Sequence, residues 1–533
     1  MKKIKINAFL LLGSLLGLSS CTKDLDVLPK DPTVSTAETF YAQPGAYTQA
    51  LAGVYGNLSL TGTDGAGSSS LQGLDAGTSQ YGRCLWYLQD LTTDEAIWSY
   101  ENDPGTKELQ RNIWTSTNPV ILGMFSRSMV EVSFVNDFLK NTTPEKLSSR
   151  NVTDVTLLNN IALYRNEVRV LRALAYYNMM DLFGKAPFVT ENDAVNTAGP
   201  EYNRQQLFAF IESELNDVLP NLKAPRTNEY GRVDQAVARM ILAKIYLNAE
   251  VYIGTPKYTE CVAQCNAIIA GGYTLNTNYL NNFKADNQNS SEMIFTLQSD
   301  GVVTQNYGPT TVFVNGEVGS IEQNGASFGV SAGAWGGALR LRKQFVQKFD
   351  GPSFTNDTRN TIISGTRNID VADIANRDQG YILAKYSNKS SFGVAGVNST
   401  FVDTDFPLFR LADVYLMYAE CALRGGAGAT STQALTYVNA LRERANSGSV
   451  SANISSGDLT LDFILDERAR ELHWESHRRQ DLIRFGKFTG GSYNWAWKGN
   501  GSNGIAISNN LKLFPIPANA IASNPNLTQN PGY

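Results

Sequence analysis

The longest helical pattern in this chain is Asn166-Glu-Val-Arg-Val-Leu-Arg-Ala-Leu-Ala-Tyr-Tyr-Asn-Met-Met-Asp-Leu-Phe183. Its apolar residues recur at spacings of three and four, which places them on one face of a helix. The pattern extends back to residue 154, and Gly184 and Pro187 follow it as typical helix-ending residues. We therefore predict a long helix over residues 154–183 that buries one face in a core.

Similar patterns lie on both sides of this helix. They predict helices over residues 38–58, 120–139, 202–219, 233–249, 258–270, 408–423, 431–446 and 459–485. Neighbouring helices form pairs of roughly 35 to 40 residues, a period typical of degenerate tetratricopeptide repeats. The stretch over residues 272–403 differs, because Gly, Asn, Ser and Thr dominate it and its apolar runs are short. We predict a mainly α-helical protein of tetratricopeptide-like helix pairs with one long insertion of loops and short strands.

The composition fits a globular protein with a large core. The chain has 533 residues, of which 42% are apolar, 10% aromatic and 18% charged. We expect a single domain over residues 38–533, with a helical scaffold mainly over 38–271 and 404–486. Because binding residues tend to lie on irregular segments held by a rigid scaffold, the insertion over 272–403 is the expected ligand-binding region.

The N-terminus has the pattern of a bacterial lipoprotein signal. Three lysines lie among the first five residues, an apolar run covers residues 6–18, and Leu18-Ser19-Ser20-Cys21 follows. The run is too short to span a membrane, which takes about 20 residues in a helix. We predict a signal peptide over residues 1–20 and a lipid on the sulfur of Cys21. The alternative is an ordinary signal peptide whose cysteine is incidental.

Cleavage before Cys21 changes the charge of the protein. Loss of three lysines takes the net charge from −5 to −8, and a surface with this charge is a poor partner for nucleic acid. Residues 21–37 have no helical period, and we expect them to form an extended tether between the lipid and the first helix.

Histidine and cysteine are both scarce. His473 and His477 are the only histidines, which argues against a Ser-His-Asp triad. The spacing of Cys261 and Cys265 would suit a metal, but on a helix it also places two small apolar side chains on one face, and no histidine is near in sequence. We therefore expect no metal site and no cofactor.

Glu467, Glu471 and Glu475 form a stripe at four-residue spacing, interleaved with arginines. Two such carboxylates could serve as the acid and the nucleophile of a glycosidase. The neighbouring arginines would hold them ionised, however, whereas a general acid needs a raised pKa. We interpret the stripe as a structural ion network and expect no enzyme activity.

Asp413 and Glu420 lie seven residues apart on an otherwise apolar helix, and hence on one face of it. Buried carboxylates need cationic partners. We expect partners such as Arg410 or Arg442.

Further motifs run from one end of the mature chain to the other. They are 21–26 (CTKDLD), 172–187 (RALAYYNMMDLFGKAP), 238–247 (ARMILAKIYL), 407–420 (PLFRLADVYLMYAE), 465–484 (LDERARELHWESHRRQDLIR), 514–517 (FPIP) and 529–533 (QNPGY). By these motifs the chain resembles the SusD/RagB family of outer-membrane lipoproteins that work beside TonB-dependent transporters. The resemblance is closest to the starch-binding founder of the family, in 91–98 (LTTDEAIW), 306–308 (NYG) and 493–499 (YNWAWKG).

This resemblance implies a function. It implies a lipid-anchored protein on the cell surface that captures an oligosaccharide, with an α-glucan as the leading ligand, and passes it to a SusC-like TonB-dependent transporter. Another glycan, such as a fructan or a host glycan, would fit the family equally. A purely structural cap of the transporter is a further hypothesis, and a glycoside hydrolase is the least favoured one.

Sugars present apolar C–H faces and hydroxyl groups, so a binding site needs exposed rings and planar polar side chains. By the resemblance, Tyr100, Tyr307 and Trp335 match an arc of aromatic residues that follows a curved α-glucan. Tyr100 stands where the founder has a tryptophan. For each ring the alternative is a loop anchor packed on the scaffold, and we expect Trp98 to be the core member beside Tyr100.

The resemblance also implies polar sugar ligands. Arg83 matches one of them, and either Asn102 or Asp103 matches another, because the register between these two neighbours is not fixed by the sequence.

Overall fold

The computed structural model of the protein describes residues 36–319 and 322–533. The predicted signal peptide, Cys21 and most of the predicted tether lie outside the described residues. The described chain is mainly α-helical, as predicted. Its longer helices are α3 (Ala46–Ser59), α6 (Pro119–Asn141), α8 (Val155–Phe183), α9 (Arg204–Val218), α10 (Gln235–Leu247), α12 (Tyr258–Ile269), α15 (Leu411–Leu423), α16 (Ser431–Ala445) and α17 (Leu461–Leu472).

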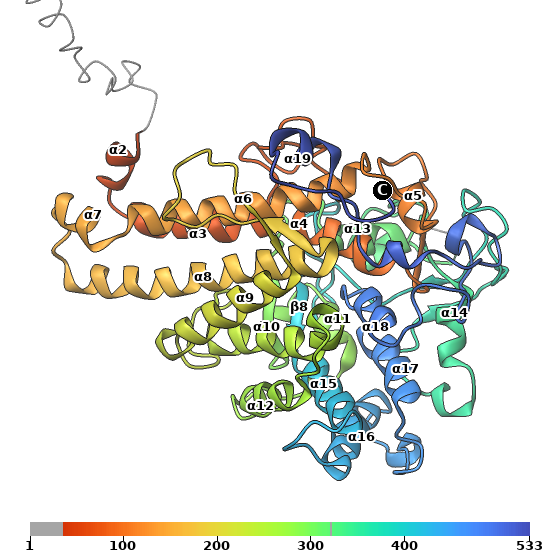
Figure 1. Cartoon of the computed structure of the whole chain (residues 1–533). Helices are drawn as coiled ribbons and strands as arrows, with labels where there is room; N and C mark the ends of the chain where they lie inside the picture. Colours follow the sequence, from red (N-terminus) through yellow and green to blue (C-terminus); the bar gives the residue numbers. More distant parts are fainter. Residues whose placement is uncertain (1–35, 320–321) are drawn as a thin grey trace, which may run out of the picture.

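These helices pack on their neighbours in chain order. Helix α3 packs on α6, α6 on α8, and α8 on α9; α10 packs on α12, α12 on α15, and α15 on α16. Figure 1 shows α3, α6 and α8 side by side, with α10, α12, α15 and α16 continuing the stack below them in that view. The predicted helix pairs are thus confirmed. Within residues 36–319 and 322–533, no helix is long and apolar enough to cross a bilayer.

Helix α8 forms where the sequence predicts it. The side chain of Asp154 caps its start by accepting a hydrogen bond from the backbone N–H of Leu157. Gly184 ends it in the left-handed conformation (φ 72°), which glycine adopts without steric cost. Most of its buried apolar residues form part of the main core, and Ile161 belongs to a smaller one.

Shorter helical elements fill the remaining segments. They are α2 (Ala37–Tyr41), α4 (Tyr81–Trp86), a π-helical turn (Tyr87–Leu91), α5 (Thr106–Gln110), α7 (Pro144–Ser149), α11 (Ala249–Ile253), α13 (Pro309–Glu317), α14 (Lys343–Val346), α18 (Arg478–Arg484) and α19 (Ala518–Ser523). Of these, α13 and α14 lie inside the insertion, where only loops and short strands were predicted.

Two predicted helices are wrong as continuous elements. The helix over 38–58 is divided into α2 and α3 by Pro44 and by Gly45 (φ 77°), and α2 starts at Ala37 with Thr36 as its cap. The helix over 459–485 is divided into α17 and α18.

The break between α17 and α18 is built from buried hydrogen bonds. Trp474 and Ser476 both have positive φ there (61° and 64°). Their backbone N–H groups donate to buried carboxylates, Trp474 to Glu95 (3.0 Å) and Ser476 to Asp90 (2.7 Å). Arg478, the first residue of α18, pairs with Asp94 (2.7 Å). Because these partners lie almost 400 residues earlier in the chain, local helical periodicity does not reveal the break.

Short antiparallel ladders join the insertion to the scaffold. Strand β1 (Ala96–Trp98) pairs with β5 (Leu339–Leu341), and β4 (Met293–Leu297) pairs with β8 (Phe406–Arg410). The remaining ladders pair β2 (Lys185–Pro187) with β3 (Glu201–Asn203), and β6 (Ile362–Ile363) with β7 (Ile382–Leu383).

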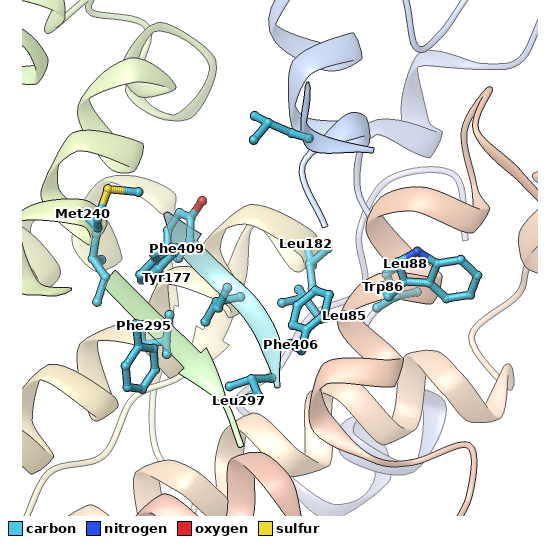
Figure 2. Packing of buried hydrophobic residues seen from close by; sticks show 14 of the residues in the cluster. Leu85, Trp86, Leu88, Tyr177, Leu182, Met240, Phe295, Leu297, Phe406 and Phe409 are labelled. Atoms are coloured by element: carbon cyan, nitrogen blue, oxygen red, sulfur yellow. The ribbon is translucent and has the colours of Figure 1, made fainter. Parts of the chain in front are cut away.

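The main core extends through both parts of the chain. Figure 2 shows Phe295 and Leu297 of β4 beside Phe406 and Phe409 of β8, with Tyr177 and Leu182 of α8 and Met240 of α10 around them. Leu85, Trp86 and Leu88 of α4 and the π-helical turn lie at the other side of the same view. Scaffold and insertion therefore share one hydrophobic core, which holds the surface loops on rigid elements.

The partners expected for Asp413 and Glu420 are wrong, although both carboxylates are buried and paired. Asp413 contacts Lys244 (2.9 Å) and Arg468 (2.8 Å). Glu420 contacts Arg424 (2.8 Å) and Arg484 (2.6 Å). The two arginines proposed from the sequence instead join a second set of buried carboxylates.

Candidate functional site

Three aromatic rings meet at the end of β1, and we call them the aromatic platform (Trp98, Tyr100 and Trp335). The ring of Trp98 is buried, as predicted, and meets the other two rings edge-on, with centroid distances of 5.6 Å to Tyr100 and 6.1 Å to Trp335. Tyr100 is 37% exposed and Trp335 is half-buried. The hydroxyl of Tyr100 donates to the backbone carbonyl of Trp335 (2.7 Å). Two rings therefore reach the surface over a buried third.

The loop of Trp335 is fixed by α13. The backbone N–H of Trp335 donates to the carbonyl of Asn315 (3.0 Å), in the last turn of that helix, and the N–H of Gly337 donates to Val318 (2.9 Å). Gly336 and Gly337 both have φ near 64°, a conformation that glycine adopts without strain. The two glycines that follow Trp335 thus turn the chain at this point, and the indole packs against Trp98.

Asn102 and Asp103 differ in their surroundings. A carboxylate oxygen of Asp103 accepts a hydrogen bond from the indole N–H of Trp98 (2.8 Å), so Asp103 holds the buried ring of the platform. Asn102 is exposed beside it. Of the two, Asn102 is the side chain that is open to a ligand.

Arg83 and Tyr307 form a second group. Both border Gly77, since a Cβ at that position would lie 3.5 Å from Nη1 of Arg83 and 3.9 Å from Cβ of Tyr307. The guanidinium of Arg83 is largely buried and donates twice to the hydroxyl of Tyr87 (2.9 and 2.7 Å). The half-buried ring of Tyr307 packs edge-on against Phe401 (5.1 Å).

Helix α13 separates the two groups. Tyr307 lies just before its first turn, and Asn315 in its last turn holds Trp335. Eight residues of rise at 1.5 Å each separate Tyr307 from Asn315, so the two groups lie roughly 12 Å apart along the helix. The loop over 399–401 runs alongside, because the amide of Asn315 donates to the carbonyl of Thr400 (2.9 Å). The structure thus brings Tyr100, Asn102 and Trp335 together and places Arg83 and Tyr307 at the far end of α13.

One side chain beside the platform belongs to no motif. Arg377 is exposed, and its Nη1 lies 3.3 Å from the hydroxyl oxygen of Tyr100. Sequence reasoning missed it because it lies 277 residues from its partner in an irregular stretch.

The glutamate stripe lies elsewhere, in a set of buried charges that we call the buried ionic cluster. Its members are Glu292, Asp357, Arg359, Lys385, Arg410, Arg442, Arg444, Glu467, Arg470, Glu471 and Glu475. Burial alone would raise the pKa of Glu471, but Arg444, Arg410 and Arg359 outweigh it and lower the pKa to about 2. Glu467 is likewise held at a pKa of about 2 by its arginines against the effect of burial. A carboxylate with so low a pKa is unsuited to act as a general acid.

The cysteines and histidines form no metal centre in the described part of the chain. Residues 36–319 and 322–533 contain no group of three or more His, Cys, Asp or Glu placed to hold a metal ion. Cys261 and Cys265 are buried on α12. His477 lies beside Lys244 (3.0 Å), and both histidines are buried in the core.

Known proteins share both sequence and fold with this chain. The sequence profile of the SusD family matches residues 274–533. The starch-binding protein SusD of Bacteroides thetaiotaomicron is 32% identical over 561 residues, which cover 97% of this chain and 96% of that protein. SusD-like protein P25 of Formosa agariphila is 25% identical and covers 88% of each chain.

Solved structures match over nearly the whole length. A SusD superfamily protein from Bacteroides thetaiotaomicron matches with a TM-score of 0.69 at 20% identity, over 91% of this chain and 99% of that chain. Surface glycan-binding protein A from the same organism, in complex with laminarihexaose, matches with a TM-score of 0.66 at 21% identity and the same coverage. Identities this low show a common fold alone. The 32% identity along almost the entire chain shows more than that, and the protein belongs to the SusD family.

Proposed function

We propose that this protein binds an oligosaccharide at the cell surface and does not cleave it. The observation that carries the proposal is the pair of surface rings, Tyr100 and Trp335, held over buried Trp98 at the positions where the resemblance expects an aromatic arc. Exposed aromatic faces suit the C–H faces of sugars, and Asn102 beside them offers an amide for hydroxyl groups.

The separation of the two groups favours an oligosaccharide over a single sugar. A ligand that contacts both the platform and Tyr307 must extend along α13, which only several linked sugar units do. Residues 38–533 then act as one domain in this proposal. The scaffold supplies Tyr100 and Arg83, and the insertion over 272–403 supplies Tyr307 and Trp335.

An α-glucan is the ligand that we propose first. The support is the relative called starch-binding protein SusD, which is 32% identical over nearly the whole chain. A structural neighbour at 21% identity holds a laminarihexaose, which is a reason to test a β-glucan as well. Another glycan, such as a fructan, is the alternative within the same role.

The absence of hydrolysis in this proposal is argued from the buried ionic cluster. Glu467 and Glu471 are fully buried and multiply paired with arginines, so neither has access to a glycosidic bond or a pKa suited to donating a proton to one.

The cellular role in the proposal follows the family resemblance. Cys21 carries the lipid that anchors the protein to the outer membrane, and the protein caps a SusC-like TonB-dependent transporter to which it delivers its ligand. Replacing Cys21 with alanine should then yield a secreted protein that is absent from outer-membrane fractions of cells lacking the transporter. Retention of this variant in those fractions would contradict the anchor.

Calorimetric titration of the mature protein tests the binding proposal. Maltoheptaose, laminarihexaose and an inulin oligosaccharide are titrated in parallel, and released reducing ends are assayed in the same samples. We expect maltoheptaose to bind, glucose to bind far more weakly, and no reducing ends to appear. Binding of only another sugar would change the ligand and keep the role. Absence of all binding would favour a structural cap of the transporter, and release of reducing ends would favour a hydrolase.

A further inference from the structure

An exposed arginine borders the aromatic platform. Nη1 of Arg377 lies 3.3 Å from the hydroxyl oxygen of Tyr100 and 3.4 Å from the carbonyl oxygen of Gly336. Its guanidinium carbon lies 5.8 Å from the centroid of the Tyr100 ring. The guanidinium therefore contacts the platform through the ring, the hydroxyl group and the Trp335 loop at once.

The charge of Arg377 is not used by an acidic side chain. In the described part of the chain no carboxylate forms an ion pair with it. Two acidic residues of its own loop have other partners, since Asp370 pairs with Lys343 (2.9 Å) and Asp373 accepts from the backbone N–H of Ala375 (3.0 Å). The third, Asp378, is exposed next to Arg377. A guanidinium has five N–H donors, and these contacts engage only one of its nitrogens.

Two other arginines hold the backbone of the loop that carries Arg377. The buried guanidinium of Arg340, on β5, donates to the backbone carbonyls of Ile374, Asn376 and Gln379. A second arginine, Arg367, donates to the carbonyl of Arg377 itself. Strand β5 is also the partner of β1, which carries Trp98. One pair of strands thus positions both the platform and the Arg377 loop, so that little backbone freedom remains to be lost on binding.

Gly336 leaves the space that Arg377 occupies. A Cβ at position 336 would lie 2.2 Å from Nη1 of Arg377, too close for the side chain to remain there. The glycines around Trp335 therefore do more than turn the chain, because they also open the platform to the arginine.

In the contact between Tyr100 and Arg377, the hydroxyl group of Tyr100 is the acceptor. The hydroxyl of Tyr100 donates to the carbonyl of Trp335, so it accepts from Arg377 with its oxygen. A tryptophan at position 100 could not accept from Arg377, because an indole N–H is a donor only. Tyr100 is thus coupled to Arg377 through a group that an indole lacks.

We propose that Arg377 is a sugar-contacting residue and that Arg377 and Tyr100 act as one unit. The inference rests on the proposed function and extends it. The ring stacks on one sugar unit, while the flat guanidinium beside it presents its remaining N–H groups to two adjacent hydroxyls of the same ligand. The ligand class is a neutral oligosaccharide with free vicinal hydroxyl groups, which match the fork of a guanidinium.

A double-mutant cycle tests this unit, with maltoheptaose as the probe and calorimetry as the measurement. The variants are Tyr100→Phe, which keeps the ring and removes the hydroxyl, Arg377→Ala, and the two combined. We expect about tenfold weaker binding for Arg377→Ala, in the range of a hydrogen bond from a charged donor. The double variant should bind nearly as well as Arg377→Ala alone, because each change breaks the same contact.

Two controls separate position from charge. Arg377→Lys keeps the charge and loses the fork, and we expect it to lie between the wild type and Arg377→Ala. Asp378→Asn changes the exposed neighbour and should leave the affinity unchanged. Because the ligand is neutral, raising the sodium chloride concentration should alter the wild-type affinity less than twofold.

The outcomes separate this inference from the proposed function. Wild-type protein that binds none of the sugars would overturn the proposed function itself. Wild-type binding with an unchanged affinity in Arg377→Ala would overturn the role of Arg377 alone. Fully additive effects of Tyr100→Phe and Arg377→Ala would show that the two residues act separately, and a steep loss of maltoheptaose affinity with salt would contradict recognition through neutral hydroxyl groups.

Discussion

Arginine has opposite surroundings in the buried ionic cluster and at the aromatic platform. In the cluster, Arg410 gives its donors to Glu292, Glu471 and Glu475, and no solvent reaches it. At the platform, Arg377 has contacts through one nitrogen and faces water with the others. The first arrangement fixes the scaffold, and the second leaves hydrogen-bonding capacity for a ligand. Unused donors beside exposed rings, rather than charge alone, distinguish the candidate site from the framework.

The sharpest test of the framework is a single neutral substitution within the cluster. Glu471→Gln leaves Arg410, Arg444 and Arg359 with an uncompensated charge, because all three contact this carboxylate. We expect the free energy of unfolding to fall by about 3 to 5 kcal/mol, measured by urea denaturation. The matched control is Glu229→Gln, which breaks an exposed pair with Arg232 and should cost less than about 1 kcal/mol. Equal losses in the two variants would contradict the contrast between buried and exposed charge.

Two buried glutamates should change the stability of the fold in opposite directions as the pH changes. Glu471 has a pKa lowered to about 2 in the folded protein, so its stabilising effect is present above pH 4.5 and is lost as the pH falls towards 2. Glu131 is the reverse case, because burial raises its pKa to about 8 despite a hydrogen bond from Asn57 (2.8 Å). Its protonated form stabilises the fold below pH 4.5, and this contribution is lost as the pH rises through 8.

Glu131→Gln separates these two effects. The amide keeps an acceptor for Asn57 and does not ionise. Between pH 4.5 and 8 the free energy of unfolding should therefore fall further in the wild type than in the variant, by on the order of 3 kcal/mol. Urea denaturation at a series of pH values measures this difference. An unchanged alkaline slope would show that Glu131 titrates normally.

The platform should be sensitive to loss of its larger surface ring. Trp335→Ala is expected to weaken maltoheptaose binding by about 1 to 3 kcal/mol and to leave the far-ultraviolet circular dichroism of the helices unchanged. Phe392→Ala is the control, since this ring is 90% exposed and forms no part of the platform. If both variants bind like the wild type, Trp335 is a loop anchor and the sugar lies elsewhere.

The smallest effects should distinguish the two polar neighbours of the platform. Asn102→Ala removes one exposed amide and should weaken binding by about 0.5 to 1.5 kcal/mol without a change in melting temperature. Asp103→Ala removes the acceptor of the Trp98 indole, so it should weaken binding and also lower the melting temperature. The opposite pattern, with stability lost in Asn102→Ala alone, would exchange the two roles.

Local patterns predicted most of the scaffold, and the exceptions have specific causes. The helix over 154–183 has a cap, a periodic face and a terminal glycine in its own sequence, so nothing distant is needed to form it. The break after α17 depends on Asp90 and Glu95, which no local pattern in 459–485 contains. In the platform, family resemblance predicted Tyr100 and Trp335 as binding residues. Arg377 has no motif, and only the folded chain brings it to Tyr100.

The hydrogen bonds at the break between α17 and α18 also bear on the order of folding. Asp90, Asp94 and Glu95 precede the strand that carries Trp98, and their partners Trp474, Ser476 and Arg478 are made long afterwards during synthesis. Before those partners are made, the three carboxylates have no hydrogen-bond or ion-pair partner there. Burying them unpaired would cost free energy, so this segment does not adopt its final conformation. Contacts so distant in sequence slow folding, because a very long loop must close before they form. The segment that leads into the platform is therefore expected to become fixed only after residues 474–478 have been made.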